Sequence, residues 1–368
     1  MTTSMREALV RPQAISHNVQ AIRSATSAAK TLVVVKADGY GHGALTAARA
    51  ALEGGADWLG TADVDEALAL RSAGITAPVL AWLFGPGDDL SVALGNAIDL
   101  GVSSPAQLAQ VSSQAGPGTV ARIHLKIDTG LGRSGATMDQ WAALCEAAAT
   151  AERAGRVRVV GVYSHLSGAS AEADAAQGAV FRLACEQARA AGVDPELCHI
   201  SASNGASNSP ELASDMVRIG IAAYGVPVAG RFTELGLRPA MRLSGQVVLT
   251  KRVPSGQAVG YGQTYRTTTE TTLALVPLGY ADGVPRHASS AGPVVIAGER
   301  FSVSGRISMD QFSVDVGDHT VREGDWCVLW GDPAEGHPSV EEWAEAAGTI
   351  GYEMITRVGP RVPRVIER

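Results

Sequence analysis

Across the first two thirds of this 368-residue chain, short apolar runs alternate with alanine-rich amphipathic stretches. Several runs are too short for helices and are rich in β-branched residues, which indicates buried strands. The stretches between them are full of Ala, Leu, Glu and Gln at helical length. The predicted strands are residues 31–37, 58–63, 78–84, 97–103, 122–128, 159–165, 197–203 and 215–221, and the predicted helices include 43–54, 64–73, 105–114, 139–154 and 171–192.

Strands that alternate with helices predict βαβ units and a parallel sheet. Eight such units in about 220 residues match the size of a closed (β/α)8 barrel of the TIM type. An open, doubly wound sheet is the alternative, and the count alone does not separate the two. We therefore predict an α/β chain with a cofactor-binding barrel over residues 10–235.

After about residue 236 the alanine-rich helices end, and Thr, Val and Gly dominate. This change predicts a mostly-β C-terminal domain over residues 236–368. The predicted strands lie within 243–253, 271–278, 293–303, 311–316 and 326–330, and one helix interrupts them at 339–349.

The composition excludes several classes of protein. Hydrophobic residues make up 46% of the chain, which intrinsic disorder does not allow. The net charge is −7 without a basic cluster, so we expect no nucleic-acid partner. Without an apolar run of membrane length or a secretory signal, we expect no membrane span and a cytoplasmic location. The four cysteines are expected to be buried and free, and the histidines lack ligand spacing, so no metal site is predicted.

Chemistry in such a barrel is placed at the carboxyl ends of the strands. Lys36 follows the first strand directly and precedes a glycine-rich segment, residues 37–43. A lysine in apolar surroundings has a lowered pKa and a free amine for attack on a carbonyl. For Lys36 alone, however, a lysine that extends along the surface to solvent is the favoured interpretation.

Lys126 and Arg133 follow the fifth strand, and residues 130–135 match GxGxxG. A dinucleotide site is disfavoured here, because the motif is mid-chain and does not open the first βα unit. Arg133 is better suited to bind a carboxylate through its planar guanidinium.

His165 ends the sixth strand, Asn204 and Gly205 follow the seventh, and Arg218 and Gly220 belong to the eighth. Loops after the last two strands often bind phosphate, and glycines let backbone N–H groups approach it. A lone histidine such as His165 is more often structural. Together, however, an amine, a phosphate cradle and arginines at strand ends predict pyridoxal phosphate.

Eight motifs then identify a family resemblance. VVVKADGYGHGA, KIDTGLGRSG, GVYSHLSGA, RIGIAAYG, VGYGQTY, LGYADG, GRISMDQ and GTIGYE occur in the order typical of alanine racemases. The chain resembles this family from about Arg6 to Arg364. The resemblance implies a barrel that binds pyridoxal 5′-phosphate, a C-terminal β domain joined by residues 1–9, and a homodimer. Each active site would combine the barrel of one subunit with the β domain of the other.

The resemblance also implies a reaction: L-alanine and D-alanine are interconverted by two-base proton transfer on an aldimine of the cofactor, and D-alanine is supplied for peptidoglycan. Lys36 resembles the lysine that holds the cofactor and acts as one base, and Tyr261 resembles the second base, from the partner subunit. Tyrosine is a weak base at neutral pH, and His165 with Arg218 would activate it. Arg218 resembles the residue that faces the pyridine nitrogen. Because a guanidinium offers only hydrogen-bond donors, that nitrogen would stay unprotonated.

Further residues are similar to the binding residues of the family. Lys126 aligns with a lysine that some members carbamylate, which would orient Arg133. Gly205 stands where many members have Ser, and Ser308 stands where several have Cys. The phosphate side would consist of Tyr40, Asn204, Gly205, Gly220, Ile221 and Tyr352, and the substrate side of Arg133, Met309 and Tyr280.

Three other functions remain open: a broad-specificity racemase of the same fold, an amino-acid decarboxylase, and a non-catalytic carrier of pyridoxal phosphate. Tyr280 and Tyr352, which would narrow the entry channel, favour a small substrate. The motifs around Tyr261 and Met309 disfavour a decarboxylase. A carrier usually lacks a second domain.

Overall fold

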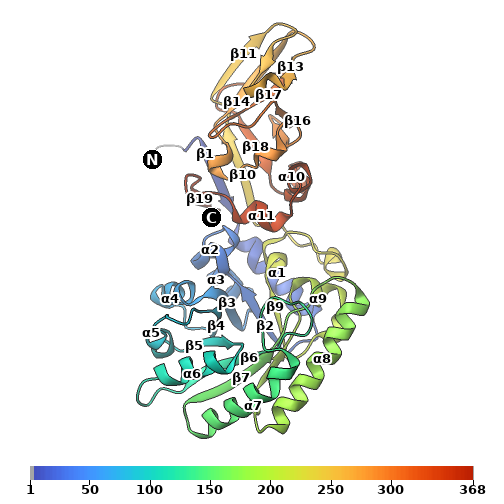
Figure 1. Cartoon of the computed structure of the whole chain (residues 1–368). Coiled ribbons are helices and arrows are strands. Elements are labelled where there is room, and N and C mark those ends of the chain that lie inside the picture. Colours follow the sequence, from blue (N-terminus) through green and yellow to red (C-terminus); the bar gives the residue numbers. More distant parts are fainter. Residues whose placement is uncertain (1–3, 368) are drawn as a thin grey trace.

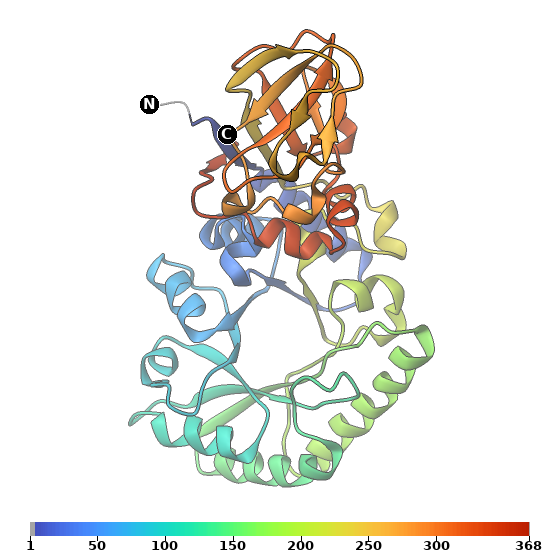
Figure 2. The ribbon, with the colours of Figure 1, turned by 45° about the horizontal axis from the view of Figure 1, so that its top comes forward.

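The computed structural model describes residues 4–367, and the first three residues of the predicted segment 1–9 lie outside that range (Figure 1). Within it, eight parallel strands follow one another in the order β8-β7-β6-β5-β4-β3-β2-β9. The helices lie around the outside of these strands (Figure 2). The strands are β2 (Lys30–Val34), β3 (Trp58–Asp63), β4 (Val79–Leu83), β5 (Ile98–Val102), β6 (Ala121–Lys126), β7 (Val157–Tyr163), β8 (Leu197–His199) and β9 (Met216–Ile219).

The first and last of these strands are neighbours, which excludes the open doubly wound sheet. Lys30 of β2 pairs with Met216 of β9 in parallel register. At the remaining seam, an isolated bridge joins Ala202 to Arg218, so the barrel is nearly closed. Each predicted barrel strand overlaps an observed one.

Most barrel helices also lie where the amphipathic stretches predict them. α6 begins with Pro105 after Ser104, whose side chain accepts from the Gln107 N–H, as is typical of a helix N-cap. The helices are α1 (Pro12–Ala25), α3 (Ala44–Glu53), α4 (Val64–Ser72), α5 (Ser91–Gly95), α6 (Pro105–Gln114), α7 (Met138–Arg153), α8 (Ala171–Ala190) and α9 (Ser203–Asn208).

The second sheet has nine strands within the described range, in the order β11-β14-β17-β16-β15-β18-β10-β1-β19. The N-terminal strand β1 pairs antiparallel with β10 and parallel with β19. The strands are β1 (Arg6–Val10), β10 (Met241–Gln246), β11 (Leu249–Val253), β14 (Thr271–Val276), β15 (Pro293–Ile296), β16 (Glu299–Ser304), β17 (Phe312–Gly317), β18 (Trp326–Trp330) and β19 (Arg364–Ile366).

Two of the predicted strand regions are each two strands. Region 243–253 contains β10 and β11, and region 293–303 is the hairpin of β15 and β16. The hairpin turns at Ala297 and Gly298, which both have positive φ, as a two-residue turn requires. The predicted helix is α10 (Val340–Ala347), and α11 (Gly351–Thr356), the short hairpin of β12 (Ala258–Val259) and β13 (Tyr265–Arg266), and β19 were not predicted.

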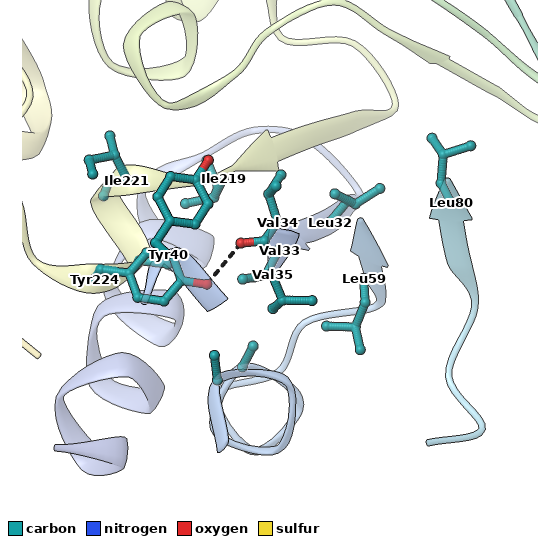
Figure 3. Close-up of a cluster of buried hydrophobic side chains, with 14 of the residues drawn as sticks. Leu32, Val33, Val34, Val35, Tyr40, Leu59, Leu80, Ile219, Ile221 and Tyr224 are labelled. Atoms are coloured by element: carbon teal, nitrogen blue, oxygen red, sulfur yellow. Dashed lines mark hydrogen bonds between the residues drawn. The ribbon is translucent and has the colours of Figure 1, made fainter. Parts of the chain in front are cut away.

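Buried side chains around β2, the first barrel strand, hold the segment that leads to Lys36. The Tyr224 hydroxyl donates to the Val34 carbonyl at 2.9 Å, and Tyr40 packs against the Tyr224 ring at a centroid distance of 4.8 Å (Figure 3). The side chains of Leu32 and Leu59 are fully buried nearby (Figure 3). Within residues 4–367, no helix combines the length and apolar character that crossing a bilayer requires.

Candidate active site

A cavity of about 820 Å³ lies where the barrel strands end, and most of the predicted site residues line it. The β domain contributes to its wall through Ile350 and Tyr352, next to and on α11. The predicted residues that line it are Lys36, Tyr40, Lys126, Arg133, His165, Asn204, Gly205, Arg218, Gly220, Ile221 and Tyr352.

The turn after β2, α2 (Lys36–Tyr40), begins at Lys36, and the four residues after Lys36 have left-handed backbone conformation. Ala37, Asp38 and Tyr40 have φ angles of 52°, 54° and 52°. A residue with a Cβ pays about 1–2 kcal/mol for this conformation. Strain of this kind clusters at functional sites and persists only where the surroundings hold it.

Contacts from distant elements hold this turn. The Glu66 carboxylate accepts from the Ala37 N–H at 2.6 Å, and Arg364 Nε donates to the Gly41 carbonyl at 2.9 Å. His42 Nδ1 lies 2.9 to 3.0 Å from two carbonyl oxygens of the turn, so this nitrogen carries the proton. Burial lowers the pKa of His42 to about 4, which keeps the ring neutral.

Lys36 has the environment that its predicted chemistry needs. Its Nζ lies 5.7 Å from the centre of the Trp82 ring. Burial first, and then the Arg133 cation, lowers the pKa of Lys36, and the Glu66 carboxylate opposes this shift. The fraction of free amine at neutral pH therefore rises, as nucleophilic chemistry requires.

Lys126, the last residue of β6, lies close to Arg133 and is buried. Burial, followed by the charges of Arg133 and Arg218, lowers its pKa to about 8. Its amine donates to the Ser134 hydroxyl. Because Lys36 and these three cations line one cavity, the site favours an anionic ligand.

Arg218, on β9, is fixed more firmly than any other predicted residue of the site. Burial lowers its pKa to about 10, which leaves it protonated at neutral pH. Its Nε–H has no hydrogen-bond partner within residues 4–367, so it can donate to a ligand in the cavity. The two Nη groups donate to His199 Nδ1 (2.9 Å), the His199 carbonyl (3.0 Å), the Ser164 carbonyl (2.7 Å), the Ile200 carbonyl (3.0 Å) and His165 Nδ1 (3.1 Å).

His165 receives its orientation from Arg218. Because guanidinium only donates, His165 Nδ1 is the acceptor and Nε2 carries the proton. Burial and the cations Arg218, Arg133, Lys126 and Lys36 lower its pKa to about 3. His165 is therefore a neutral hydrogen-bond donor in the wall of the cavity.

In the cavity wall just beyond Arg218, Gly220, Tyr40 and Ser203 lie against one another. A Cβ at Gly220 would overlap the Tyr40 hydroxyl, so only glycine fits there. The Gly220 N–H, predicted as a phosphate donor, donates to Ser203 Oγ at 3.0 Å. Ser203 was missed in the sequence, and its only signal was its place directly before Asn204.

The other residues of this wall differ in exposure. Asn204 is exposed, whereas Gly205 and Ile221 are buried. A Cβ on Gly205 would lie 2.7 Å from Leu166, so the site has no space for a larger residue without rearrangement. The Tyr352 ring lies 6.4 Å from the Tyr40 ring.

Tyr261, Tyr280 and Met309 are absent from the cavity wall in the described part of the chain. Their exposed fractions are 73%, 42% and 56%. Their loops pack together: Tyr280 N–H donates to the Ser308 carbonyl at 3.1 Å, and a Cβ at Gly260 would lie 3.3 Å from Arg306 N. The three predicted β-domain residues thus lie on neighbouring loops that leave their side chains exposed.

Comparisons with known proteins agree with this architecture. The family profile of the alanine racemase N-terminal domain matches residues 10–227, and that of the C-terminal domain matches residues 240–366. The alanine racemase of Salinispora arenicola is 51% identical over 365 residues, which cover 97% of each chain. The alanine racemase of Thermobifida fusca is 48% identical and covers 99% of this chain and 98% of its own.

Solved structures show the same similarity. The alanine racemase of a D-cycloserine-producing Streptomyces lavendulae superposes with a TM-score of 0.97 at 45% identity, covering 100% of this chain and 98% of its own. That of Streptomyces coelicolor gives 0.96 at 44% identity, covering 98% and 97%. The chain therefore belongs to the alanine racemase family of isomerases.

Proposed function

We propose that this racemase interconverts L-alanine and D-alanine with pyridoxal phosphate, at a site that two copies of the chain complete. The observation that carries the proposal is the split of the predicted residues into two groups. Lys36, Arg218 and His165 line one cavity, whereas Tyr261 is exposed on the β domain of the same chain. A second subunit would bring its Tyr261 to the cavity.

The cavity fits the cofactor in size and charge. Cationic side chains line it and would balance a phosphate dianion and a substrate carboxylate. The Tyr40 and Ser203 hydroxyls also line it beside Gly220, where a Cβ would fill the space. Lys36 would hold the cofactor covalently, and Arg218 Nε–H would face its ring nitrogen. When bound, the cofactor withdraws electrons from the substrate α-carbon and acidifies its proton.

Two bases on opposite faces suit a racemase, because the proton leaves one face and returns on the other. Lys36 Nζ would serve one face, since burial lowers its pKa and raises the share of free amine. Tyr261 of a second copy would serve the other. The His165 Nε2–H would donate to its oxygen and stabilise the phenolate, while the His165 ring stays neutral.

Arg133 would bind the substrate carboxylate, and Lys126 would govern its orientation. With a pKa of about 8, Lys126 has the free amine that carbamylation by CO2 requires. A carbamate would reverse the sign of its charge and turn repulsion of Arg133 into attraction. Mass spectrometry of the intact protein would reveal the modification as one added CO2.

Alanine is favoured over larger amino acids. Tyr352 lies in the cavity wall, and Tyr280 with Met309 of the second copy would narrow the remaining entry. A broad-specificity racemase is the weaker proposal, because the relatives of this chain are alanine racemases. The same proposal includes a domain boundary between residues 235 and 236, a cytoplasmic location and a supply of D-alanine for peptidoglycan.

Chiral chromatography tests the reaction and the substrate together. Purified protein is incubated with L-alanine, L-serine or L-lysine, with and without added pyridoxal phosphate. We expect alanine alone to reach an equal mixture of enantiomers quickly. Racemisation of lysine would instead favour broad specificity, and no racemisation despite bound cofactor would favour a carrier.

A further inference from the structure

A row of polar side chains runs through the barrel core behind Arg218. His199 Nδ1 lies 2.9 Å from Arg218 Nη1, and His199 Nε2 lies 3.0 Å from His124 Nδ1. His124 Nε2 lies 3.3 Å from Asp99 Oδ2, and Arg122 closes the row with bonds of 2.9 and 3.2 Å to Asp99. His199 and His124 are completely buried and Asp99 is 1% exposed.

The two ends of the row determine the direction of each hydrogen bond in it. The guanidinium of Arg218 can only donate, so His199 Nδ1 accepts and His199 Nε2 carries the proton. His199 then donates to His124 Nδ1, and His124 donates from Nε2 to the Asp99 carboxylate. Both rings must therefore be neutral and in the Nε2–H tautomer, since a further proton on either ring would face another donor.

The surrounding strands make room for this row. A Cβ at Gly161 on β7 would overlap His124 Nδ1, and one at Gly101 on β5 would overlap the Tyr163 hydroxyl. Glycine inside a strand weakens it and marks a close approach of another group. The Tyr163 ring stacks on His199 at 5.1 Å with an angle of 9° between planes.

In the described chain, His199, His124 and Asp99 are not part of the cavity wall. Of the residues that line the cavity, His199 touches Tyr163 by stacking and Arg218 by hydrogen bonds, so its effect on the hydrogen-bond donors of the site passes through Arg218. His199 engages one Nη group of Arg218 twice, through its ring and its carbonyl. The other Nη group is held by Ser164, Ile200 and His165, so the Nε–H is the donor that remains for the cavity.

We propose that His199, His124 and Asp99 are positioning residues that hold Arg218 in one orientation, with both histidines neutral and protonated on Nε2. The role of Arg218 in this proposal rests on the proposed function. The order of protons along the row does not. Asp99, near the opposite end of the barrel, thereby orients a donor of the active site.

Nuclear magnetic resonance of the full chain, labelled with 15N at histidine, tests the order of protons. Two-bond 1H–15N correlations show which ring nitrogen carries the proton, and His124→Gln and His199→Gln spectra assign the signals. We expect both rings to be neutral with the proton on Nε2, as the order of donors along the row requires. A protonated ring, or the Nδ1–H tautomer in either one, would overturn the proposal.

Asp99→Asn tests the long-range effect, with Asp57→Asn as its matched control. Asp57 is a carboxylate at the same end of the barrel, paired with Lys30 at 3.2 Å and outside the row. We expect Asp99→Asn to shift the His199 Nε2–H resonance, to change the visible absorbance of bound pyridoxal phosphate, and to lower kcat about tenfold with KM within about twofold.

The control variant Asp57→Asn should leave the His199 resonance, the absorbance of the cofactor and kcat unchanged. Equal effects of the two substitutions, or an unshifted His199 resonance in Asp99→Asn, would contradict the proposal. If Asp99→Asn does not fold, the tautomers of the unaltered protein still decide it. Absence of racemisation with both tautomers as expected would overturn the proposed function alone.

Discussion

Arg218, which the barrel contributes to the site, is buried and held by several partners, whereas Tyr261, Tyr280 and Met309 of the β domain are exposed on adjoining loops. Arg218 is 5% exposed and donates five hydrogen bonds, but Tyr261 is 73% exposed. Exposed large side chains on adjoining loops are typical of a surface that another molecule covers. In the proposed assembly, the barrel would orient Arg218 before a second copy binds, whereas Tyr261 would act only in a site of that second copy.

Replacement of Lys36 by alanine should have the largest effect. In the proposed function this variant would lose the amine that both holds the cofactor and moves a proton, so racemisation should fall by at least about 1,000-fold. Reduction with borohydride followed by mass spectrometry would show whether cofactor remains attached. Covalent cofactor in this variant would contradict the role of Lys36 and weaken the contrast between the two halves.

Tyr261→Phe should act on chemistry alone. We expect kcat to fall by about 100-fold or more, because a general base is lost, while cofactor affinity stays unchanged. Tyr265→Phe is the matched control, since Tyr265 lies on the same domain and its hydroxyl bonds to Asp315 at 2.8 Å. Equal losses of cofactor affinity and kcat in the Tyr261 variant would indicate a structural role.

Gly220→Ala should weaken the cofactor site of the barrel. The new Cβ would overlap the Tyr40 hydroxyl, and we expect the Kd for pyridoxal phosphate to rise about tenfold in an absorbance titration. Gly95→Ala is the control, because no heavy atom lies within 4 Å of the position of its Cβ. An unchanged Kd would show that this wall does not hold the cofactor.

Lys126→Gln should have the smallest effect, and it should be stabilising. The pKa of Lys126, about 8 in the folded protein, lies below that of unfolded lysine. The folded state therefore binds fewer protons than the unfolded state from about pH 8 to about pH 10.4, and the free energy of unfolding rises with pH there.

Below about pH 8 the buried cation destabilises the cofactor-free protein in bicarbonate-free buffer. Thermal unfolding at pH 7 should therefore show a higher Tm for Lys126→Gln, with a gain of about 1 kcal/mol or more. A lower Tm in the same buffer would show that Lys126 is instead stabilised by its surroundings.

The barrel was predictable because its strands are buried on both faces, so their apolar runs are continuous, and its helices are long and alanine-rich. The turn that carries Lys36 was not predictable. Ala37, Asp38 and Tyr40 rarely adopt positive φ, and contacts with Glu66 and Arg364, both distant in sequence, hold them there.

The site itself was predictable where a strand end carries a polar residue, as at Lys36, Lys126 and Arg218. Ser203 was missed because its partner, the Gly220 N–H, belongs to the next strand, and a lone serine gives no signal. The row from His199 to Asp99 was missed for a related reason. Its members are single polar residues in apolar strands, and only the closure of the barrel brings them together.

The claim that two copies complete each site can be tested most directly by mixing the two inactive variants. Equal amounts of Lys36→Ala and Tyr261→Phe protein are unfolded, refolded together and assayed for racemisation of L-alanine. If each site combines Lys36 of one subunit with Tyr261 of the other, a mixed dimer has one site with both defects and one site with neither. Random pairing makes about half of the dimers mixed, so about one quarter of all sites regain full activity. If each chain supplies its own Tyr261, the mixture will show only the residual activity of the two variants.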